Sequence, residues 1–162
     1  MKIAIIVPME EEAEFYKKHF KSENKEVFGT TEFDHFSVNG NDIYLGLSGI
    51  GKVNAAMNLT SLLTKEDIDV IFMTGSAGSL QEDVKRKDLI LPNKFMYYDA
   101  HNTSAGNYVE GQIPQEPAGY TLDNSFRTKF AAYLKEHDIP FKEGLIVTGD
   151  SFIASEAQKD EI

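Results

Sequence analysis

The chain has 162 residues, 41% of them hydrophobic, and a formal net charge of −10. This length suits one domain with a sizeable core, so we expect residues 1–162 to form a single domain. The negative charge argues against nucleic acid or an anionic membrane as a partner, because both bind basic patches. The lack of cysteine excludes a disulfide framework and thiolate zinc sites, and no apolar run has the length of a membrane span, so we expect a cytoplasmic protein.

The chain begins with strand and helix patterns. Lys2–Val7 is an almost unbroken apolar run, typical of a strand covered on both faces. Glu10–Phe20 has acids at its start and apolar residues at roughly helical spacing, which predicts a helix. Thr31–Val38 and Asp42–Leu47 flank Asn39-Gly40-Asn41, and this arrangement predicts a β-hairpin.

Lys52–Leu63 has the strongest helical pattern of the chain. Its apolar residues share one stripe: Val53, Ala56, Met57, Leu59, Leu62 and Leu63. The apolar run Val70–Met73 then predicts a strand that closes a β-α-β unit, which should cross over right-handedly. These patterns predict an α/β fold.

The second half is less regular. Leu89–Leu91 begins a strand that Phe95–Asp99 continues past a bend, and His101–Tyr120 has the composition of a long functional or interfacial loop. Three elements should follow: a helix over Leu122–His137 with Asp123-Asn124-Ser125 near its start, a strand over Lys142–Val147, and a helix over Ser155–Ile162 capped by Ser155. That last segment contains no helix-ending signal, so we expect the sequence to be a fragment of a longer polypeptide.

Small polar and acidic residues follow four of the expected strands. The segments are Pro8–Glu12, Ser48–Lys52, Thr74–Gly78 and Thr148–Phe152. In open α/β sheets, ligands bind in the crevice at the carboxyl ends of the strands. Glycines in such turns let the backbone approach a ligand closely. The four segments therefore predict a site for a small polar ligand.

The glutamates at positions 10–12 have two interpretations. Acids suit a helix N-terminus, where the helix dipole favours them. Alternatively, one of them points over the sheet edge and acts as a general base. Glu12 is the candidate for that role, because its spacing puts it on the helix side of Phe15, Tyr16 and Phe20.

Gly75-Ser76-Ala77-Gly78 could form an anion-binding nest, but it lacks the arginine that phosphate sites usually contain. Because an acidic triplet in the same crevice would repel phosphate, the electrostatics favour water activated by a carboxylate. Phe152 could stack on a base or a sugar, or pack in the core. The four histidines show no metal-ligand spacing, so we expect no metal site. We also expect no cofactor.

Six motifs in register resemble the bacterial 5'-methylthioadenosine/S-adenosylhomocysteine nucleosidases, members of the purine nucleoside phosphorylase superfamily. They are Met9–Glu12, Ser48–Ala56, Thr74–Gly78, Tyr98-Asp99-Ala100, Glu110–Pro114 and Gly144–Ile153. The resemblance implies a mixed central β-sheet flanked by helices, lacking its C-terminal part here. It also implies a homodimer.

The same resemblance implies hydrolysis of the N-glycosidic bond of methylthioadenosine and S-adenosylhomocysteine, which releases adenine and a thioribose in methionine salvage. Glu12 would activate water, and Ser76 would help to hold it. The remaining roles concern binding: Met9 and Ile50 would line the slot for the alkylthio group, Gly78 and Ile153 would supply backbone contacts to the ligand, and Phe152 would pack against adenine.

The chain also departs from the family pattern. The family's general acid, which protonates the purine, and its ribose-gripping Met-Glu pair correspond to positions beyond Ile162. We therefore expect little or no turnover if these 162 residues are the whole polypeptide. Tyr98 stands where a histidine is usual. Two alternative functions stay open at this point: a phosphate-dependent purine nucleoside phosphorylase, and a catalytically inactive nucleoside-binding remnant.

Overall fold

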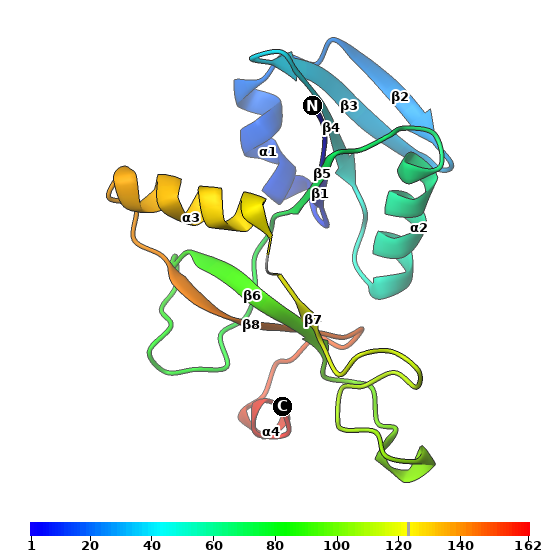
Figure 1. Cartoon of the computed structure of the whole chain (residues 1–162), viewed down its shortest axis with the longest axis vertical. Helices are drawn as coiled ribbons and strands as arrows, with labels where there is room; N and C mark the ends of the chain where they lie inside the picture. Colours follow the sequence, from blue (N-terminus) through cyan, green and yellow to red (C-terminus); the bar gives the residue numbers. More distant parts are fainter. Residues whose placement is uncertain (123) are drawn as a thin grey trace. The chain divides into compact units, whose positions relative to one another are not determined.

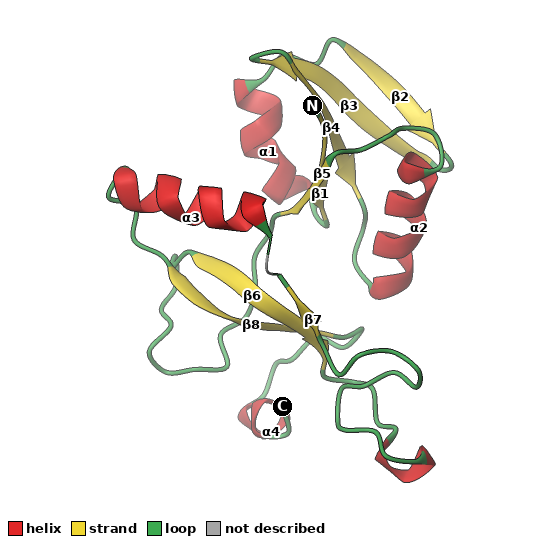
Figure 2. Cartoon of the chain, in the orientation of Figure 1, coloured by secondary structure: helices red, strands yellow, loops and turns green. Residues whose placement is uncertain are grey.

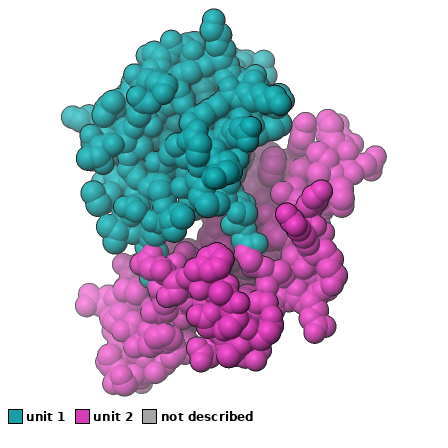
Figure 3. Space-filling view, turned by 180° about the vertical axis from the view of Figure 1, so that it is seen from behind, with its two compact units in different colours: residues 1–77 teal, residues 78–162 magenta. Residues whose placement is uncertain are grey.

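A computed structural model describes residues 1–122 and 124–162. The chain divides into two compact units, Met1–Ala77 (unit 1) and Gly78–Ile162 (unit 2), which Figure 3 shows in two colours. Asp123, which we expected near the start of a helix, lies outside the described residues. That residues 1–162 act as a single domain stays a prediction, and each unit is described by itself.

Unit 1 is a five-stranded mixed sheet with two helices (Figure 1). Its elements are β1 (Lys2–Val7), α1 (Glu10–His19), β2 (Asn24–Phe28), β3 (Thr31–Val38), β4 (Asn41–Leu47), α2 (Lys52–Leu63) and β5 (Val70–Met73). The strand order is β2-β3-β4-β1-β5; β1 pairs in parallel with β4 and β5, whereas β3 pairs antiparallel with β2 and β4. The mixed sheet flanked by helices that the resemblance implied is therefore present.

The hairpin between β3 and β4 forms at the predicted place, although Asn41 belongs to β4 and not to the turn. Val38 pairs with Asn41, so Asn39 and Gly40 make the turn. Both have positive φ, 52° and 75°, the backbone conformation that a two-residue hairpin turn of type I′ requires. Asparagine and glycine tolerate this region better than other residues, so the local sequence fixes the register of the pair.

The sheet of unit 1 buries apolar side chains on both faces, and the helix elements α1 and α2 cover opposite faces (Figure 2). On one face, Ala4, Ile6, Phe28, Phe33 and Tyr44 pack with Leu62 of α2. On the other face, Val7, Phe36 and Leu45 pack with Ala13 of α1. Because β1 contributes to both clusters, its sequence is apolar without alternation.

At the centre of the first cluster, Phe33 of β3 lies against a glycine of β4. Phe33 is 0% exposed and pairs directly with Gly46. A β-carbon at position 46 would overlap the Phe33 ring, so only glycine fits opposite this side chain. The absence of a side chain on one strand thus accommodates a large one on its neighbour.

Unit 2 contains a three-stranded sheet in the order β7-β6-β8. Its elements are β6 (Ile90–Tyr97), the 3₁₀ turn η1 (Thr103–Ala105), β7 (Tyr120–Thr121), α3 (Ser125–Glu136), β8 (Lys142–Thr148) and α4 (Glu156–Asp160). β6 pairs in parallel with β8 and antiparallel with β7. The bend expected inside β6 is a register shift between Pro92 and Lys94 within one continuous strand.

Polar contacts cap the helices α3 and α4 of unit 2 and join α3 to the sheet. Asn124 caps α3 by accepting a hydrogen bond from the Arg127 amide at 2.8 Å. Arg127 in turn donates from Nε to the Pro92 carbonyl at 2.7 Å and pairs with Glu143 at 2.9 Å, which joins α3 to β6 and β8. Ser155 caps α4 as predicted, accepting from the amide of Gln158.

An ion pair at the start of β8 anchors the turn that precedes β6. Lys142 Nζ lies 3.0 Å from Asp88 Oδ2, and the same carboxylate oxygen accepts a hydrogen bond from the Lys85 amide at 3.0 Å. The Lys85 amide first, and then the Lys142 ammonium, lower the pKa of Asp88 below its ordinary value. The charged form of Asp88 is therefore the form that the folded unit favours.

Two features of unit 1 differ from the sequence expectation. β2 was not predicted, because Asn24-Lys25-Glu26 is polar; it forms as an edge strand that pairs with β3 and buries only Phe28. The apolar stripe of α2 is divided rather than wholly covered. Leu62 is 0% exposed, whereas Val53 and Met57 are exposed by 67% and 58%.

Candidate active site

The parallel strands of unit 1 bring three loops to one edge of the sheet. β4, β1 and β5 are neighbours and run in the same direction, so their carboxyl ends meet. Pairing extends just beyond the strands: the Ser48 amide bonds to the Val7 carbonyl at 2.9 Å, and the Thr74 amide bonds to the Ile6 carbonyl at 3.1 Å. The loops Pro8–Met9, Ser48–Gly51 and Thr74–Ser76 therefore start from fixed positions.

Glu12 of α1 reaches the loop that follows β5. Its Oε1 accepts two hydrogen bonds from Ser76, one from the amide at 2.6 Å and one from the hydroxyl at 2.8 Å. Its Oε2 accepts a third from the Met9 amide at 3.3 Å. Three of the seven residues proposed from sequence, Met9, Glu12 and Ser76, thus meet at one carboxylate.

Gly75 permits this contact. A β-carbon at position 75 would lie 3.0 Å from Glu12 Oε1 and 3.1 Å from the carboxyl carbon and Oε2. Such distances are tighter than about nine in ten real contacts of a β-carbon, so a side chain at this position would displace the carboxylate by a few tenths of an ångström. The close approach of backbone and carboxylate is a reason for the glycine that the sequence pattern alone did not supply.

A second contact ties α1 to the same loop. The hydroxyl groups of Tyr16 and Thr74 share a hydrogen bond of 3.1 Å. Tyr16 lies one helical turn after Glu12, so both side chains leave the same face of α1. Sequence reasoning placed Tyr16 on this face but did not identify its contact with the loop.

The loop after β4 carries Ile50 and is held by α2. Asn58 Nδ2 donates to the Ser48 carbonyl at 2.5 Å, and Asn54 Nδ2 donates to the Ile50 carbonyl at 2.7 Å. Gly49 and Gly51 have φ values of 74° and 102°, which residues with a side chain rarely adopt. The Ile50 side chain is 73% exposed, so it is available to contact an apolar group of a ligand.

Three of the predicted residues belong to unit 2. Gly78 is exposed, and Phe152 and Ile153 lie in the loop after β8. Phe152 is 89% exposed. The sequence left open that Phe152 packs in the core, and the structure shows that it does not.

The carboxylate of Glu12 is suited to accept a proton. It is only partly buried, and Ser76 beside it is exposed, so water can reach the pair. Bonds from an N–H and an O–H hold one oxygen in place while the carboxylate keeps further acceptor capacity. A general base needs this combination of fixed position and access to its proton donor.

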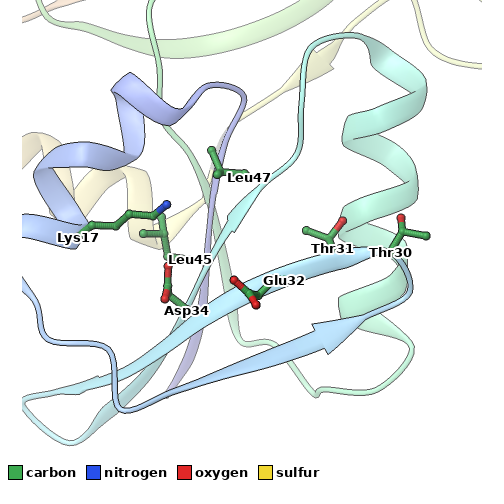
Figure 4. A pocket seen from close by; sticks show the side chains of 7 residues that line it. All are labelled: Lys17, Thr30, Thr31, Glu32, Asp34, Leu45 and Leu47. Carbon is green, nitrogen blue, oxygen red and sulfur yellow. The ribbon is translucent and has the colours of Figure 1, made fainter.

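A pocket elsewhere in unit 1 does not include any of these residues. It has a volume of about 220 Å³ and is lined by Lys17, Thr30, Thr31, Glu32, Asp34, Leu45 and Leu47 (Figure 4). Glu32 is ion-paired with Lys25, and Lys17 with Glu10, both at 2.6 Å. Two of the charged side chains of the lining are thus already ion-paired, and Asp34 is the third charged residue of the lining.

Residues 1–122 and 124–162 contain neither a cluster of metal-ligating side chains nor a membrane-spanning helix. No group of three or more histidine, aspartate or glutamate side chains is arranged to hold a metal ion there. Within the same residues, no helix has the length and apolar character needed to cross a membrane.

The fold, together with the Glu12 carboxylate at the carboxyl ends of the parallel strands, defines an α/β protein with an enzyme-like site. A sequence profile of the Phosphorylase superfamily matches residues 2–162, and the chain belongs to this superfamily. The resemblance noted from the motifs is confirmed by sequence comparison. The chain is 38% identical to the 5'-methylthioadenosine/S-adenosylhomocysteine nucleosidase of Staphylococcus epidermidis over 160 residues, which cover 99% of this chain and 70% of that protein.

Solved structures agree with this relationship. S-adenosylhomocysteine nucleosidase from Streptococcus pyogenes, in complex with 5-methylthiotubericidin, matches with a TM-score of 0.91 and 30% identity over 99% of this chain and 68% of that one. Futalosine hydrolase of Helicobacter pylori matches with a TM-score of 0.92 and 27% identity, over 99% of this chain and 69% of the other. The nucleoside phosphorylase-like fold implied by the sequence is therefore confirmed.

Proposed function

We propose that this protein hydrolyses the N-glycosidic bond of 5'-methylthioadenosine and S-adenosylhomocysteine, releasing adenine and a thioribose. The observation that carries the proposal is the Glu12 carboxylate held by the Ser76 amide and hydroxyl at 2.6 and 2.8 Å. It occurs in a chain 38% identical to a nucleosidase with this pair of substrates in its name.

In the proposed reaction, Glu12 removes a proton from water as the water oxygen bonds to the anomeric carbon. The bond from that carbon to the purine nitrogen breaks, its electron pair leaves with adenine, and adenine takes up a proton from solvent. Positive charge builds on the sugar as this bond lengthens, as in other glycosidic cleavages. Glu12 then returns to solvent the proton that it removed from water. Ser76 contributes by fixing the carboxylate and by holding the water with its hydroxyl.

The remaining residues would bind the nucleoside. We propose that Met9 and Ile50 line the slot for the alkylthio group, that Gly78 and Ile153 supply backbone contacts, and that Phe152 packs against adenine. The exposure of Ile50 and Phe152, 73% and 89%, supports roles in which an apolar ligand group covers them.

Water rather than phosphate is the proposed nucleophile. The loop Thr74–Ser76 already receives a carboxylate on its Ser76 amide, the kind of group that would otherwise bind a phosphate oxygen. A phosphate placed beside this carboxylate would meet like charge. The protein is therefore proposed as a hydrolase that needs no cofactor.

We also propose that the protein acts in the cytoplasm as a homodimer without nucleic-acid or membrane partners. Exposed apolar side chains of α2, Val53 and Met57, support an association of this kind because such patches mark interaction surfaces. Sedimentation velocity at several protein concentrations tests the dimer; a single monomeric species at all of them contradicts it.

Adenine release is the decisive test. The protein is incubated at stoichiometric concentration with methylthioadenosine in phosphate-free buffer, for long enough that slow turnover is counted. We expect adenine and methylthioribose, with oxygen-18 from labelled water on the anomeric carbon. S-adenosylhomocysteine should also be cleaved, and futalosine serves as the competing substrate.

Three results would contradict the proposal. Release that requires phosphate and yields a sugar 1-phosphate identifies a phosphorylase. Cleavage of futalosine in preference to both thio-nucleosides changes the substrate. Binding of methylthioadenosine without any product identifies a nucleoside-binding protein.

A further inference from the structure

The loop that follows β8 is held by side chains. The amides of Asp150 and Ser151 bond to side chains of the two residues that follow β6, and the amide of Ala154 bonds to Gln158 Oε1 at 2.9 Å. The course of this loop, which carries Phe152 and Ile153, therefore depends on a few polar side chains.

Tyr98 makes the closest of these contacts. Its hydroxyl donates to the Ser151 carbonyl at 2.6 Å and accepts from the Ser151 amide at 3.2 Å. One phenol thus engages both backbone groups of the residue immediately before Phe152. A hydroxyl can do this because it is donor and acceptor at once.

The neighbouring residues reinforce the contact. Asp99 Oδ2 accepts a hydrogen bond from the Asp150 amide at 3.0 Å. A β-carbon on Gly149 would lie 2.5 Å from Tyr98 Cε1 and Cζ and 2.9 Å from Asp99 Cγ. The loop therefore crosses directly over the Tyr98 ring, and glycine at position 149 makes that crossing possible.

The sheet explains why β6 can hold this loop. β6 and β8 are parallel neighbours, Tyr97 pairs with Thr148, and the Tyr98 amide bonds to the Thr148 carbonyl at 3.0 Å. Both strands end at the same level, so the residues after β6 lie beside the residues after β8. Tyr98 is fixed by the ladder, and the loop is fixed by Tyr98.

We propose that Tyr98 is a positioning residue for purine recognition: its hydroxyl fixes the backbone of Ser151 so that Phe152 and Ile153 are pre-oriented for the base. The inference rests on the proposed function, which assigns the base to these two residues. Holding a loop in its binding conformation increases affinity by reducing the ordering cost of association. The Phe152 side chain is 89% exposed, so packing does little to hold it.

Tyr98→Phe tests the proposal because it removes the hydroxyl and keeps the ring over Gly149. We expect the dissociation constant for adenine, measured by titration calorimetry, to rise about tenfold, the effect of losing one to two hydrogen bonds. With methylthioadenosine, KM should rise by a similar factor while kcat changes less than twofold. The thermal midpoint should stay near that of the wild type.

Tyr133→Phe is the matched control. Tyr133 is half-exposed on α3, stacks on His137, and lies on an element outside the loop, so the same chemical change should leave adenine affinity unchanged. Gly149→Ala tests the same contact with a second variant, which is needed if Tyr98→Phe folds poorly. Its β-carbon would displace the Tyr98 ring, so adenine binding should weaken.

The outcomes separate this inference from the proposed function. If the wild type binds adenine and Tyr98→Phe binds it equally well, the positioning role is wrong. If the wild type neither binds adenine nor releases it from methylthioadenosine, the proposed function fails, and with it the assignment of the base to this loop. In that case, hydrogen exchange at the Ser151 amide still tests whether the Tyr98 hydroxyl holds the loop. Faster exchange in Tyr98→Phe than in the wild type supports this role, and equal exchange contradicts it.

Discussion

The loops after β5 and β8 are each held by a side chain that comes from a neighbouring element. In unit 1 the group is the Glu12 carboxylate, which only accepts hydrogen bonds and takes two from Ser76. In unit 2 the group is the Tyr98 phenol, which both donates to and accepts from Ser151. Both loops therefore obtain their shape from outside their own sequence.

The two side chains differ in whether they also take part in the proposed reaction. Glu12 holds its loop and is also the proposed base, so removing it affects structure and chemistry together. Tyr98 holds its loop, but the proposed ligand contacts belong to Phe152 and Ile153. Holding and binding should therefore be separable by mutation in unit 2 and inseparable in unit 1.

Glu12→Gln should have the largest effect. The amide can still accept from Ser76 but cannot take a proton from water, so we expect adenine release to fall by about 10²- to 10⁴-fold. The rate is measured by chromatography of adenine, with Glu14→Gln on the exposed side of the same helix as the control. Equal rates for wild type and Glu12→Gln would show that the Glu12 carboxylate is not the general base.

Gly75→Ala should disturb the carboxylate without removing it. Its β-carbon would lie 3.0 Å from Glu12 Oε1, and a shift of a few tenths of an ångström should lower kcat/KM by about tenfold. Gly144→Ala on β8, where a β-carbon meets no atom within 4 Å, is the matched control. An unchanged kcat/KM in Gly75→Ala would mean that the position of the carboxylate is not critical.

Ser76→Ala should have a smaller effect, because it removes the 2.8 Å hydroxyl bond and keeps the 2.6 Å amide bond. One hydrogen bond of this kind corresponds to a decrease in kcat/KM of about 3- to 10-fold. Steady-state kinetics with methylthioadenosine measures it. A decrease as large as that of Glu12→Gln would indicate that the hydroxyl does more than hold the carboxylate and the water.

Asn124→Ala should loosen unit 2 without touching either loop. The Asn124 side chain caps α3 by accepting a hydrogen bond from the Arg127 amide. Its removal should lower the free energy of unfolding by about 1 kcal/mol. Urea unfolding measures this change, with the exposed neighbour Ser125→Ala as the control. Adenine affinity should be unaffected; a parallel loss of affinity would show that the unit and its loop are coupled.

Asp88 provides the smallest expected effect, a dependence on pH. Because its pKa is lowered in the folded chain, the carboxylate contributes stability at neutral pH, and this contribution is lost as the pH falls through the lowered value, below about 3.8. Asp88→Asn should therefore be slightly less stable than the wild type at pH 7, and the difference should shrink towards pH 2. Thermal unfolding across this range checks the sign, and a difference that grows on acidification would contradict it.

Much of unit 1 follows from local patterns. The bounds of β1, β3, α2 and β5 match the sequence prediction, because continuous apolar runs mark β1 and β5, an Asn-Gly turn follows β3, and an apolar stripe marks α2. β2 was missed because an edge strand with one buried side chain leaves little pattern in the sequence. Periodicity also predicted α2 without revealing that only part of its stripe is covered.

The candidate site was likewise predictable from the sequence only in part. The direction of Glu12 could be predicted from helical spacing, and the structure adds the partner, Ser76, 64 residues away. The contact between Tyr98 and Ser151 could not be predicted, since it depends on the parallel pairing of β6 and β8 across 53 residues. Sequence patterns describe single elements, whereas these contacts arise from which strand ends become neighbours.

The pair of Phe33 and Gly46 has a consequence for how this sheet can vary. The aromatic ring occupies the volume that a methyl group on Gly46 would need, so neither position can change freely while the other stays as it is. Gly46→Ala alone should be strongly destabilising, and Phe33→Leu alone should leave a void. Introduced together, the two substitutions should compensate in part, and a double-mutant cycle on unfolding free energies should report a large coupling between them.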